Sequence, residues 1–205
     1  MIKNIVFDVG MVLVDFCYMD YMKGLGFTEE TCRAFEKYII MSELWNDMDR
    51  GELMLDDAEV RFKERLRKLY RPCDREVELF VNNIKGIVRE YDYSKPLLQG
   101  LKDAGYKVYI LSNYPMDLSD LHWKDFSFLQ VADGYIISAY EKIVKPDERI
   151  YRLLTERFGA KLEESVFIDD RQINIDAAEK LGMRGILFRG YDELLAELNL
   201  LGVKK

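Results

Sequence analysis

The stretch of sequence that decides the fold is Lys3-Asn4-Ile5-Val6-Phe7-Asp8-Val9-Gly10. Its short apolar run with β-branched residues is typical of a buried strand in a parallel sheet, and the run ends on an acid. Open α/β sheets bind their ligands outside the carboxyl ends of the strands, because the loops that leave the strands there can converge. Asp8 is therefore a candidate nucleophile or metal ligand, although Asp and Gly are also ordinary turn residues.

Composition limits the class of protein. A chain of 205 residues that is 49% hydrophobic can form one domain with an insertion, or two small ones. The net charge of −7 and the lack of a long basic run argue against nucleic acid as a partner, but not against a small phosphorylated metabolite. The N-terminus does not resemble a signal peptide, and no apolar run approaches the ~18–20 residues of a membrane span. We therefore expect a cytoplasmic protein with no membrane partner.

Helical patterns with charged faces occupy residues 16–91. Thr28 is a candidate N-cap, a long helix is predicted from Asp56 or Asp57 up to Pro72, and a further helix from Val77 to Ile87. From residue 92 onward, helices alternate with short apolar strands. This pattern predicts an α/β fold with a doubly wound parallel sheet, formed by residues 1–15 and 92–205, and an all-helical domain inserted at 16–91.

Polar residues with related chemistry follow three of the predicted strands. Asp8 follows the first, and the later strands end on the pairs Ser112-Asn113 and Asp169-Asp170, while Lys145 precedes a helix between those two. Each could be a turn acid, a helix cap or a solvated lysine, but their recurrence at one edge of the sheet predicts a single site. The set offers a nucleophile, groups that hold anionic oxygens, a cation and acids for a divalent metal.

Four segments of the chain resemble, in order, the four motifs of the haloacid dehalogenase-like hydrolases. They are Phe7-Asp8-Val9-Gly10, Leu111-Ser112-Asn113, Lys145-Pro146-Asp147 and Phe167-Ile168-Asp169-Asp170. The helical insertion stands where that family has its type 1 cap domain. The first motif is most similar to the branch that includes α-D-glucose-1-phosphate phosphatase. The resemblance implies a Rossmann-like core with a cap over the site.

The resemblance also implies a role for each motif. Asp8 and Lys145 are the catalytic residues: Asp8 attacks phosphorus and forms an aspartyl phosphate, while Lys145 balances charge. The transferring phosphate is bound by Ser112, the Asn113 backbone N–H and Lys145. A Mg²⁺ ion is expected on ligands from Asp8, the Gly10 carbonyl, Asp170 and Asp169, because Mg²⁺ prefers oxygen ligands. Asn174 would orient the last of these loops.

Gly10 departs from the family pattern, because most of its phosphatases have an acid–base aspartate there. Losing general acid–base help costs typically ~10²–10⁴ in rate. Asp15 is a candidate substitute. A side chain at position 10 would also be disfavoured if the backbone there adopts a conformation that only glycine tolerates.

The leading prediction is a Mg²⁺-dependent phosphatase of small phosphomonoesters, with sugar phosphates such as glucose 1-phosphate among the candidate substrates. A metal-free haloacid dehalogenase is the alternative enzyme, and Gly10 leaves open a catalytically weak or idle binding domain. In the cap, Trp45 and Arg50 are the candidates for substrate contact. The only histidine, His122, is expected to be neither base nor ligand. The oligomeric state is left open, with a monomer plausible.

Overall fold

Five parallel strands form the central sheet of the computed structural model, which describes residues 1–204. The order across the sheet is β5-β4-β1-β6-β7. These strands are β1 (Asn4–Phe7), β4 (Lys107–Ser112), β5 (Gly134–Ile137), β6 (Ser165–Asp169) and β7 (Arg184–Leu187). Because β1 lies between β4 and β6, the carboxyl ends of these three strands are side by side. This confirms the predicted parallel sheet.

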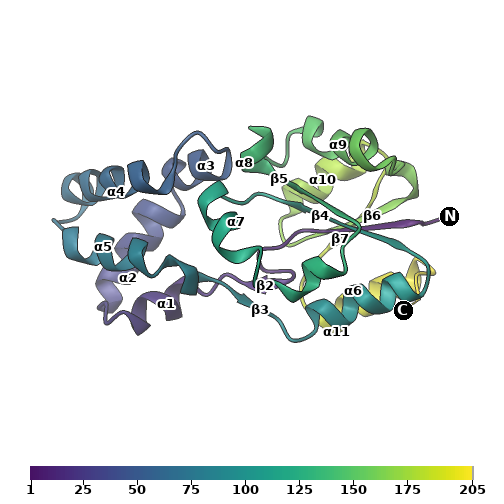
Figure 1. Cartoon of the computed structure of the whole chain (residues 1–205), viewed down its shortest axis with the longest axis horizontal. Coiled ribbons are helices and arrows are strands. Elements are labelled where there is room, and N and C mark those ends of the chain that lie inside the picture. Colours follow the sequence, from purple (N-terminus) through teal and green to yellow (C-terminus); the bar gives the residue numbers. More distant parts are fainter. Residues whose placement is uncertain (205) are drawn as a thin grey trace.

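Helices cover both faces of the sheet (Figure 1). Alternate residues of each strand point to opposite faces, so Ile5 and Phe7 belong to one apolar core and Val6 to the other. The first core includes α6 (Ser94–Asp103) and α11 (Tyr191–Leu200), and the second includes α9 (Glu148–Phe158) and α10 (Gln172–Lys180). The doubly wound α/β architecture is therefore confirmed.

The helical lobe between β1 and β4 packs around aromatic side chains. Phe35, Phe62 and Phe80 are completely buried there, so they form lobe core. The lobe consists of α1 (Tyr18–Gly24), α2 (Glu29–Phe35), a π-helical turn (Glu36–Ile40), α3 (Glu43–Asp49), α4 (Leu55–Leu69), α5 (Asp74–Asn82) and a 3₁₀ turn (Ile84–Ile87). The single helix predicted from Val77 to Ile87 is thus wrong: α5 ends at Asn82 and a separate 3₁₀ turn follows. Thr28 does cap α2, accepting from the Thr31 N–H at 3.2 Å.

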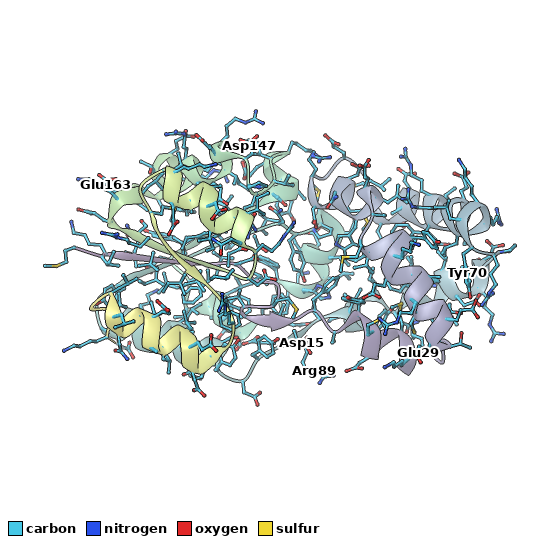
Figure 2. The ribbon with its side chains drawn as sticks, turned by 180° about the vertical axis from the view of Figure 1, so that it is seen from behind. Asp15, Glu29, Tyr70, Arg89, Asp147 and Glu163 are labelled. Atoms are coloured by element: carbon cyan, nitrogen blue, oxygen red, sulfur yellow. The ribbon has the colours of Figure 1, made fainter. Side chains whose placement is uncertain are left out.

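Two short antiparallel strands connect the lobe to the sheet domain. These are β2 (Val14–Asp15) and β3 (Arg89–Glu90), with Asp15 opposite Arg89. Figure 2 shows this pair at the junction of the two parts. We propose residues 16–91 as the cap, with its boundaries at this connection.

The lobe also contacts the sheet domain on its other side, where α3 lies beside α8 (Ser138–Glu141) (Figure 1). The Ser138 hydroxyl donates to the Asp49 carbonyl, and the Lys142 ammonium donates to the Gly51 carbonyl. The helix α7 (Met116–His122) lies between the lobe and the sheet domain (Figure 1). Among residues 1–204, none of the helices combines the length and apolar character needed to cross a membrane.

Candidate active site

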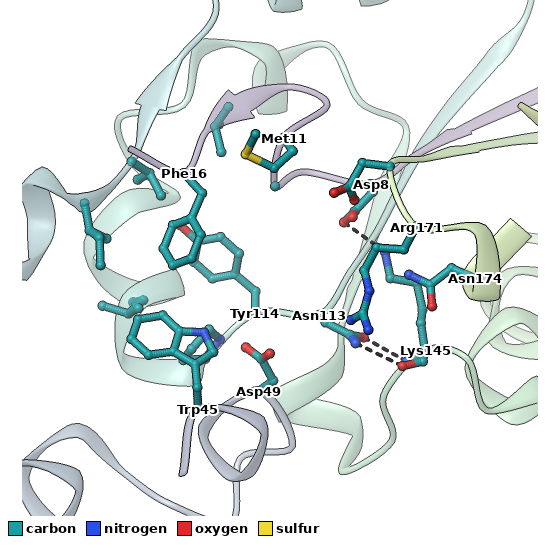
Figure 3. Close-up of a pocket in the computed structure, with 17 residues that line it drawn as sticks. Asp8, Met11, Phe16, Trp45, Asp49, Asn113, Tyr114, Lys145, Arg171 and Asn174 are labelled. Atoms are coloured by element: carbon teal, nitrogen blue, oxygen red, sulfur yellow. Dashed lines mark hydrogen bonds and ion pairs between the residues drawn. The ribbon is translucent and has the colours of Figure 1, made fainter. Parts of the chain in front are cut away.

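A cavity of about 180 Å³ lies between the carboxyl edge of the sheet and the lobe (Figure 3). The sheet domain contributes polar groups from Asp8, Asn113, Lys145, Asp170 and Arg171. The lobe and the junction contribute mostly apolar side chains, with one carboxylate among them. Residues that the sequence placed at three separate strand ends therefore meet at one cavity.

The ammonium group of Lys145 is the most deeply buried cation of this site, with 1% of its side chain exposed. It lies 2.9 Å from Asp8 Oδ1 and 2.7 Å from Asp169 Oδ2, and it donates to the Leu111 carbonyl at 2.9 Å. An ammonium has three N–H donors, and all three are used by the protein. Lys145 is thus placed to act on a bound anion through its charge, and a direct hydrogen bond would require one of these contacts to break.

Burial raises the pKa values of the acids at this site, and the neighbouring charges oppose or add to that rise. Burial raises the pKa of Asp8 to about 7, and the neighbouring ammonium of Lys145 opposes that rise. Burial and the carboxylate of Asp169 raise the pKa of Asp170. Burial alone would lower the pKa of Lys145, but the carboxylates of Asp169 and Asp8 outweigh it, so that pKa is raised. Lys145 therefore carries its positive charge at neutral pH.

The two consecutive acids at the end of β6 have different surroundings. Asp169 is completely buried, and its carboxylate accepts from Lys145, from the Arg171 backbone N–H at 2.9 Å and from the Asn174 amide at 2.9 Å. Asp170 is only partly buried, lines the cavity and forms no ion pair with any described residue. Asp170 thus has a carboxylate available to a ligand, whereas Asp169 holds Lys145 and Asn174 in position.

The acids fit a divalent cation. Asp8, Asp169 and Asp170 each offer a carboxylate oxygen, and these oxygens lie within 4.8 Å of one another. One ammonium faces these three carboxylates, which leaves an excess of two negative charges that a divalent ion would balance. Hard oxygen donors of this kind are the ligands that Mg²⁺ prefers. A bound cation would also favour the ionised carboxylates that burial disfavours.

The pair at the end of β4 is arranged differently from the expectation. Ser112 is completely buried and does not line the cavity, so its role in phosphate binding stays a prediction. Asn113 does line it, and its side-chain amide clamps the backbone of Lys145. The Asn113 Oδ1 accepts from the Lys145 N–H at 2.8 Å, while its Nδ2 donates to the Lys145 carbonyl at 3.1 Å. Asn113 therefore fixes the loop that carries the buried cation.

Gly10 lies on the cavity wall with room for a side chain. A Cβ atom built there would meet nothing within 4 Å, and the backbone is outside the positive-φ region that favours glycine. The backbone at Gly10 therefore does not exclude a side chain. Asp15 does not line the cavity, because β2 carries it to the connection with β3. It is thus not placed to replace the missing acid.

His122 is buried away from the cavity wall. Its Nε2 lies 3.1 Å from the Lys85 carbonyl, which can only accept, so Nε2 carries the proton. Its Nδ1 then accepts from the Tyr114 hydroxyl at 2.7 Å. Burial lowers the pKa of His122. The Nε2 contact thus joins α7 to the lobe, whereas the Nδ1 contact with Tyr114 lies within the sheet domain. That His122 is neither base nor ligand stays a prediction.

Of the cap residues singled out for substrate contact, Trp45 lines the cavity beside Phe16, with ring centroids 5.5 Å apart. Arg50 lies next to a smaller adjoining cavity and is ion-paired with Asp47 at 3.0 Å and Glu52 at 3.3 Å. Substrate contact by either residue stays a prediction.

Two residues that sequence reasoning missed, Asp49 and Arg171, also line the cavity. Arg171 extends its guanidinium group into the cavity (Figure 3) and forms no ion pair with any residue from 1 to 204. The sequence could have indicated Arg171, because it directly follows the predicted site residue Asp170. Asp49 ends α3, and only the docking of the lobe brings it to the site.

Comparison with known proteins identifies the class. Residues 2–182 match the haloacid dehalogenase-like hydrolases, so the chain belongs to that family and is a hydrolase. Its relatives include phosphatases. The sesquiterpene phosphatase AstK of Aspergillus oryzae is 29% identical over 152 residues, covering 72% of this chain and 74% of AstK. The D-ribitol-5-phosphate phosphatase of Bacteroides thetaiotaomicron is 28% identical, with 89% of each chain covered.

A solved structure shows the same architecture. The magnesium complex of a HAD family enzyme from Bacteroides thetaiotaomicron is 25% identical, with a TM-score of 0.69, and the alignment covers 93% of this chain and 96% of that one. The family, the α/β fold and the similarity to phosphatases that the four motifs implied are thus confirmed.

We predict that Asp170→Asn weakens Mg²⁺ binding, because it removes an anionic oxygen that forms no ion pair with any described residue. Calorimetric titration with Mg²⁺ should show a dissociation constant raised roughly tenfold or more, about 1.4 kcal/mol. Asp192→Asn, in the first turn of α11, serves as a charge-matched control. An unchanged titration for Asp170→Asn would place the ion elsewhere.

We also predict that Arg171→Gln weakens the binding of inorganic phosphate as an inhibitor. Loss of one solvent-accessible, charge-assisted contact should cost roughly 1 kcal/mol, about a fivefold rise in the inhibition constant. Arg75→Gln removes the same charge from an exposed position in α5. Equal inhibition constants for both variants would show that Arg171 does not contact phosphate.

Proposed function

We propose that this protein is a Mg²⁺-dependent phosphatase of small phosphomonoesters that acts through an aspartyl phosphate on Asp8. The observation that carries the proposal is the surroundings of the Asp8 carboxylate. Its Oδ1 is held by the Val9 N–H at 2.7 Å and by Lys145, whereas Oδ2 has no hydrogen-bond partner in the described chain. A fixed carboxylate with one free oxygen at the cavity wall is suited to in-line attack.

The surrounding residues would stabilise the charge of the reaction. The bound phosphate carries negative charge toward Asp8, and the fixed ammonium of Lys145 reduces the repulsion between them. Arg171, at the mouth of the cavity, would contact phosphate oxygens and orient phosphorus for attack. Mg²⁺ held by Asp8 and Asp170, with Asp169 nearby and the Gly10 carbonyl as a further ligand, would supply Lewis-acid stabilisation of those oxygens.

The same electrostatics weigh against the alternative of a haloacid dehalogenase. A metal-free dehalogenase would leave the excess negative charge of Asp8, Asp169 and Asp170 uncompensated beside the carboxylate of its substrate. In the proposed phosphatase, a bound Mg²⁺ would offset that charge for the phosphate, which is itself anionic. A catalytically idle binding domain, which Gly10 left open, would not need an aspartate held with one oxygen free for attack. It would also not need an acid at the cavity wall without an ion-pair partner, yet Asp8 and Asp170 have these two properties. We therefore favour phosphatase activity over both alternatives.

Apolar groups form the cavity wall where the organic part of an ester would lie. Phe16 and Trp45 from the lobe face this space, together with Val88 and Leu118 near the junction. Burying hydrocarbon against such a wall is favourable, and the wall offers few hydrogen-bond partners to the hydroxyls of a sugar. We propose esters of apolar or aromatic alcohols as substrates in preference to glucose 1-phosphate. The names of the two relatives refer to different organic groups, because one is named for a sesquiterpene and the other for ribitol 5-phosphate.

We predict that Asp8→Asn abolishes phosphate release from 4-nitrophenyl phosphate in Mg²⁺ without unfolding the protein. The amide preserves the shape of the side chain and removes the nucleophilic oxygen. Circular dichroism checks the fold, and EDTA treatment of the unaltered protein checks the metal requirement. Residual turnover above a few per cent would show that Asp8 is not the phosphoryl acceptor.

We further predict that Phe16→Ala lowers kcat/KM for benzyl phosphate by about tenfold, because roughly 1–2 kcal/mol of apolar contact is lost. Hydrolysis of glucose 1-phosphate should change little. The matched control is Tyr70→Ala, which truncates a half-buried aromatic side chain of the lobe outside this cavity. An equal loss on both esters would contradict an apolar leaving-group site at Phe16.

The cytoplasmic location stays a prediction, and the oligomeric state stays open, with a monomer plausible. Cys17, Cys32 and Cys73 are free in this structure.

A further inference from the structure

We propose that Asp49, a residue of the cap, is the general acid and base of this site and replaces the side chain that Gly10 lacks. The inference rests on the proposed phosphatase function. The space beside Gly10 is open, and Gly10 itself has no side chain that could exchange a proton with the leaving oxygen. On the opposite wall of the same cavity, α3 supplies a carboxylate.

The position of Asp49 follows from the helix that carries it. Trp45 and Asp49 are four residues apart on α3, so they lie on the same face of that helix, and both line the cavity. Figure 3 shows the Asp49 carboxylate directed into the space across from Asp8. Among residues 1–204 it has no hydrogen-bond or ion-pair partner, in contrast to the ion-paired Asp47 of the same helix.

The backbone of Asp49 is attached to the sheet domain. Its carbonyl accepts from the Ser138 hydroxyl, and the same hydroxyl oxygen accepts from the Tyr114 N–H at 3.0 Å. Ser138 is completely buried, and its contact with the Tyr114 N–H is shielded from solvent. The end of α3 is thereby held in a fixed relation to the carboxyl end of β4. A cap residue thus has the positional precision that proton transfer requires.

The opposed placement suits the stereochemistry of phosphoryl transfer. In an in-line displacement, the attacking and leaving oxygens lie on opposite sides of phosphorus. If Asp8 attacks from the sheet side, the leaving oxygen faces the lobe. The acid that protonates it must then stand on the lobe side, where Asp49 lies.

The two half-reactions balance with these groups. In the first, an Asp8 oxygen forms a bond to phosphorus, and the phosphorus–oxygen bond of the ester breaks. The electron pair of that bond goes to the leaving oxygen, which takes the Asp49 proton and departs as the alcohol. In the second, Asp49 removes a proton from water, whose oxygen bonds to phosphorus while the bond to Asp8 breaks. Inorganic phosphate leaves, and Asp49 is protonated again.

The electrostatic surroundings of Asp49 agree with this role. Burial and the carboxylate of Asp8 raise the pKa of Asp49 to about 7, against the opposing charges of Lys145, Arg171 and Arg50. A group that titrates near neutral pH can both donate and accept a proton at little cost.

The test compares Asp49→Asn with the unaltered protein over a series of phosphomonoesters, from 4-nitrophenyl phosphate to benzyl and alkyl phosphates. The quantity measured is kcat/KM in Mg²⁺, which reports the steps up to release of the alcohol. We expect a loss of ~10²–10⁴ for the alkyl esters and less than about fivefold for 4-nitrophenyl phosphate, whose leaving group needs no proton. The slope of log kcat/KM against leaving-group pKa therefore becomes steeper.

Two further variants separate proton transfer from a structural role. Glu43→Gln removes an exposed acid at the start of α3 and should leave the slope unchanged. Gly10→Asp combined with Asp49→Asn places an acid in the open space beside Asp8, and should recover at least tenfold on the alkyl esters. A misplaced or loosened α3 would slow every ester equally and would not respond to Gly10→Asp.

The outcomes are distinguishable. If the unaltered protein hydrolyses none of the esters, the proposed phosphatase function fails. If it hydrolyses them with dependence on Asp8, but Asp49→Asn leaves the slope unchanged, phosphatase function stands and the inference on Asp49 is overturned. A uniform loss across the series with no rescue by Gly10→Asp also overturns it.

Discussion

The buried ammonium of Lys145 joins the three loops from which this site is built. It contacts Asp8 after β1, the Leu111 carbonyl of β4 and Asp169 at the end of β6, and almost none of it is exposed to water. Burying these charges costs several kcal/mol per ion, which is recovered only when each partner is held in good geometry. Removing Lys145 would leave the carboxylates of Asp8 and Asp169 uncompensated in the interior, whereas the loss of one carboxylate still leaves Lys145 paired with the other. The arrangement of the strand ends therefore depends on this cluster.

Amide side chains supply the geometry that the buried charges need. Asn113 binds the backbone N–H and carbonyl of Lys145, and Asn174 donates to both oxygens of Asp169 at 2.9 and 3.0 Å. Neither amide adds charge, so the excess negative charge of the acids is left for ligands to balance. On the proposed function, metal and phosphate would enter a site whose fixed groups are already oriented, so that little reorganisation would be needed at the moment of reaction.

The sequence predicted the parts of this site that follow from local pattern. Short apolar strands that end on Asp8, Asn113 and Asp170 had to converge once the sheet was parallel, because parallel strands share one carboxyl edge. The helices of the lobe were harder to predict from the sequence. The helices α1 and α3 have only seven residues each, so the hydrophobic periodicity that indicates a helix is weak in them. Asp49 had no local signal at all. Its role depends on Ser138, 89 residues later, which fixes where α3 meets the sheet domain.

Dividing the chemistry between two parts of the chain couples specificity to rate. On our proposals, the sheet domain holds the nucleophile and the charges that would bind phosphate, whereas α3 carries both a wall of the organic pocket and the proton donor. An ester whose organic part packs against Trp45 would be held with its leaving oxygen toward Asp49, because the two residues lie on the same face of α3 and line the same cavity. An ester that packs poorly there would bind with its leaving oxygen displaced from Asp49, so it would lose proton transfer as well as apolar contact. A glycine at position 10 then makes turnover depend on the docking of α3 through Ser138, because position 10 itself supplies no acid.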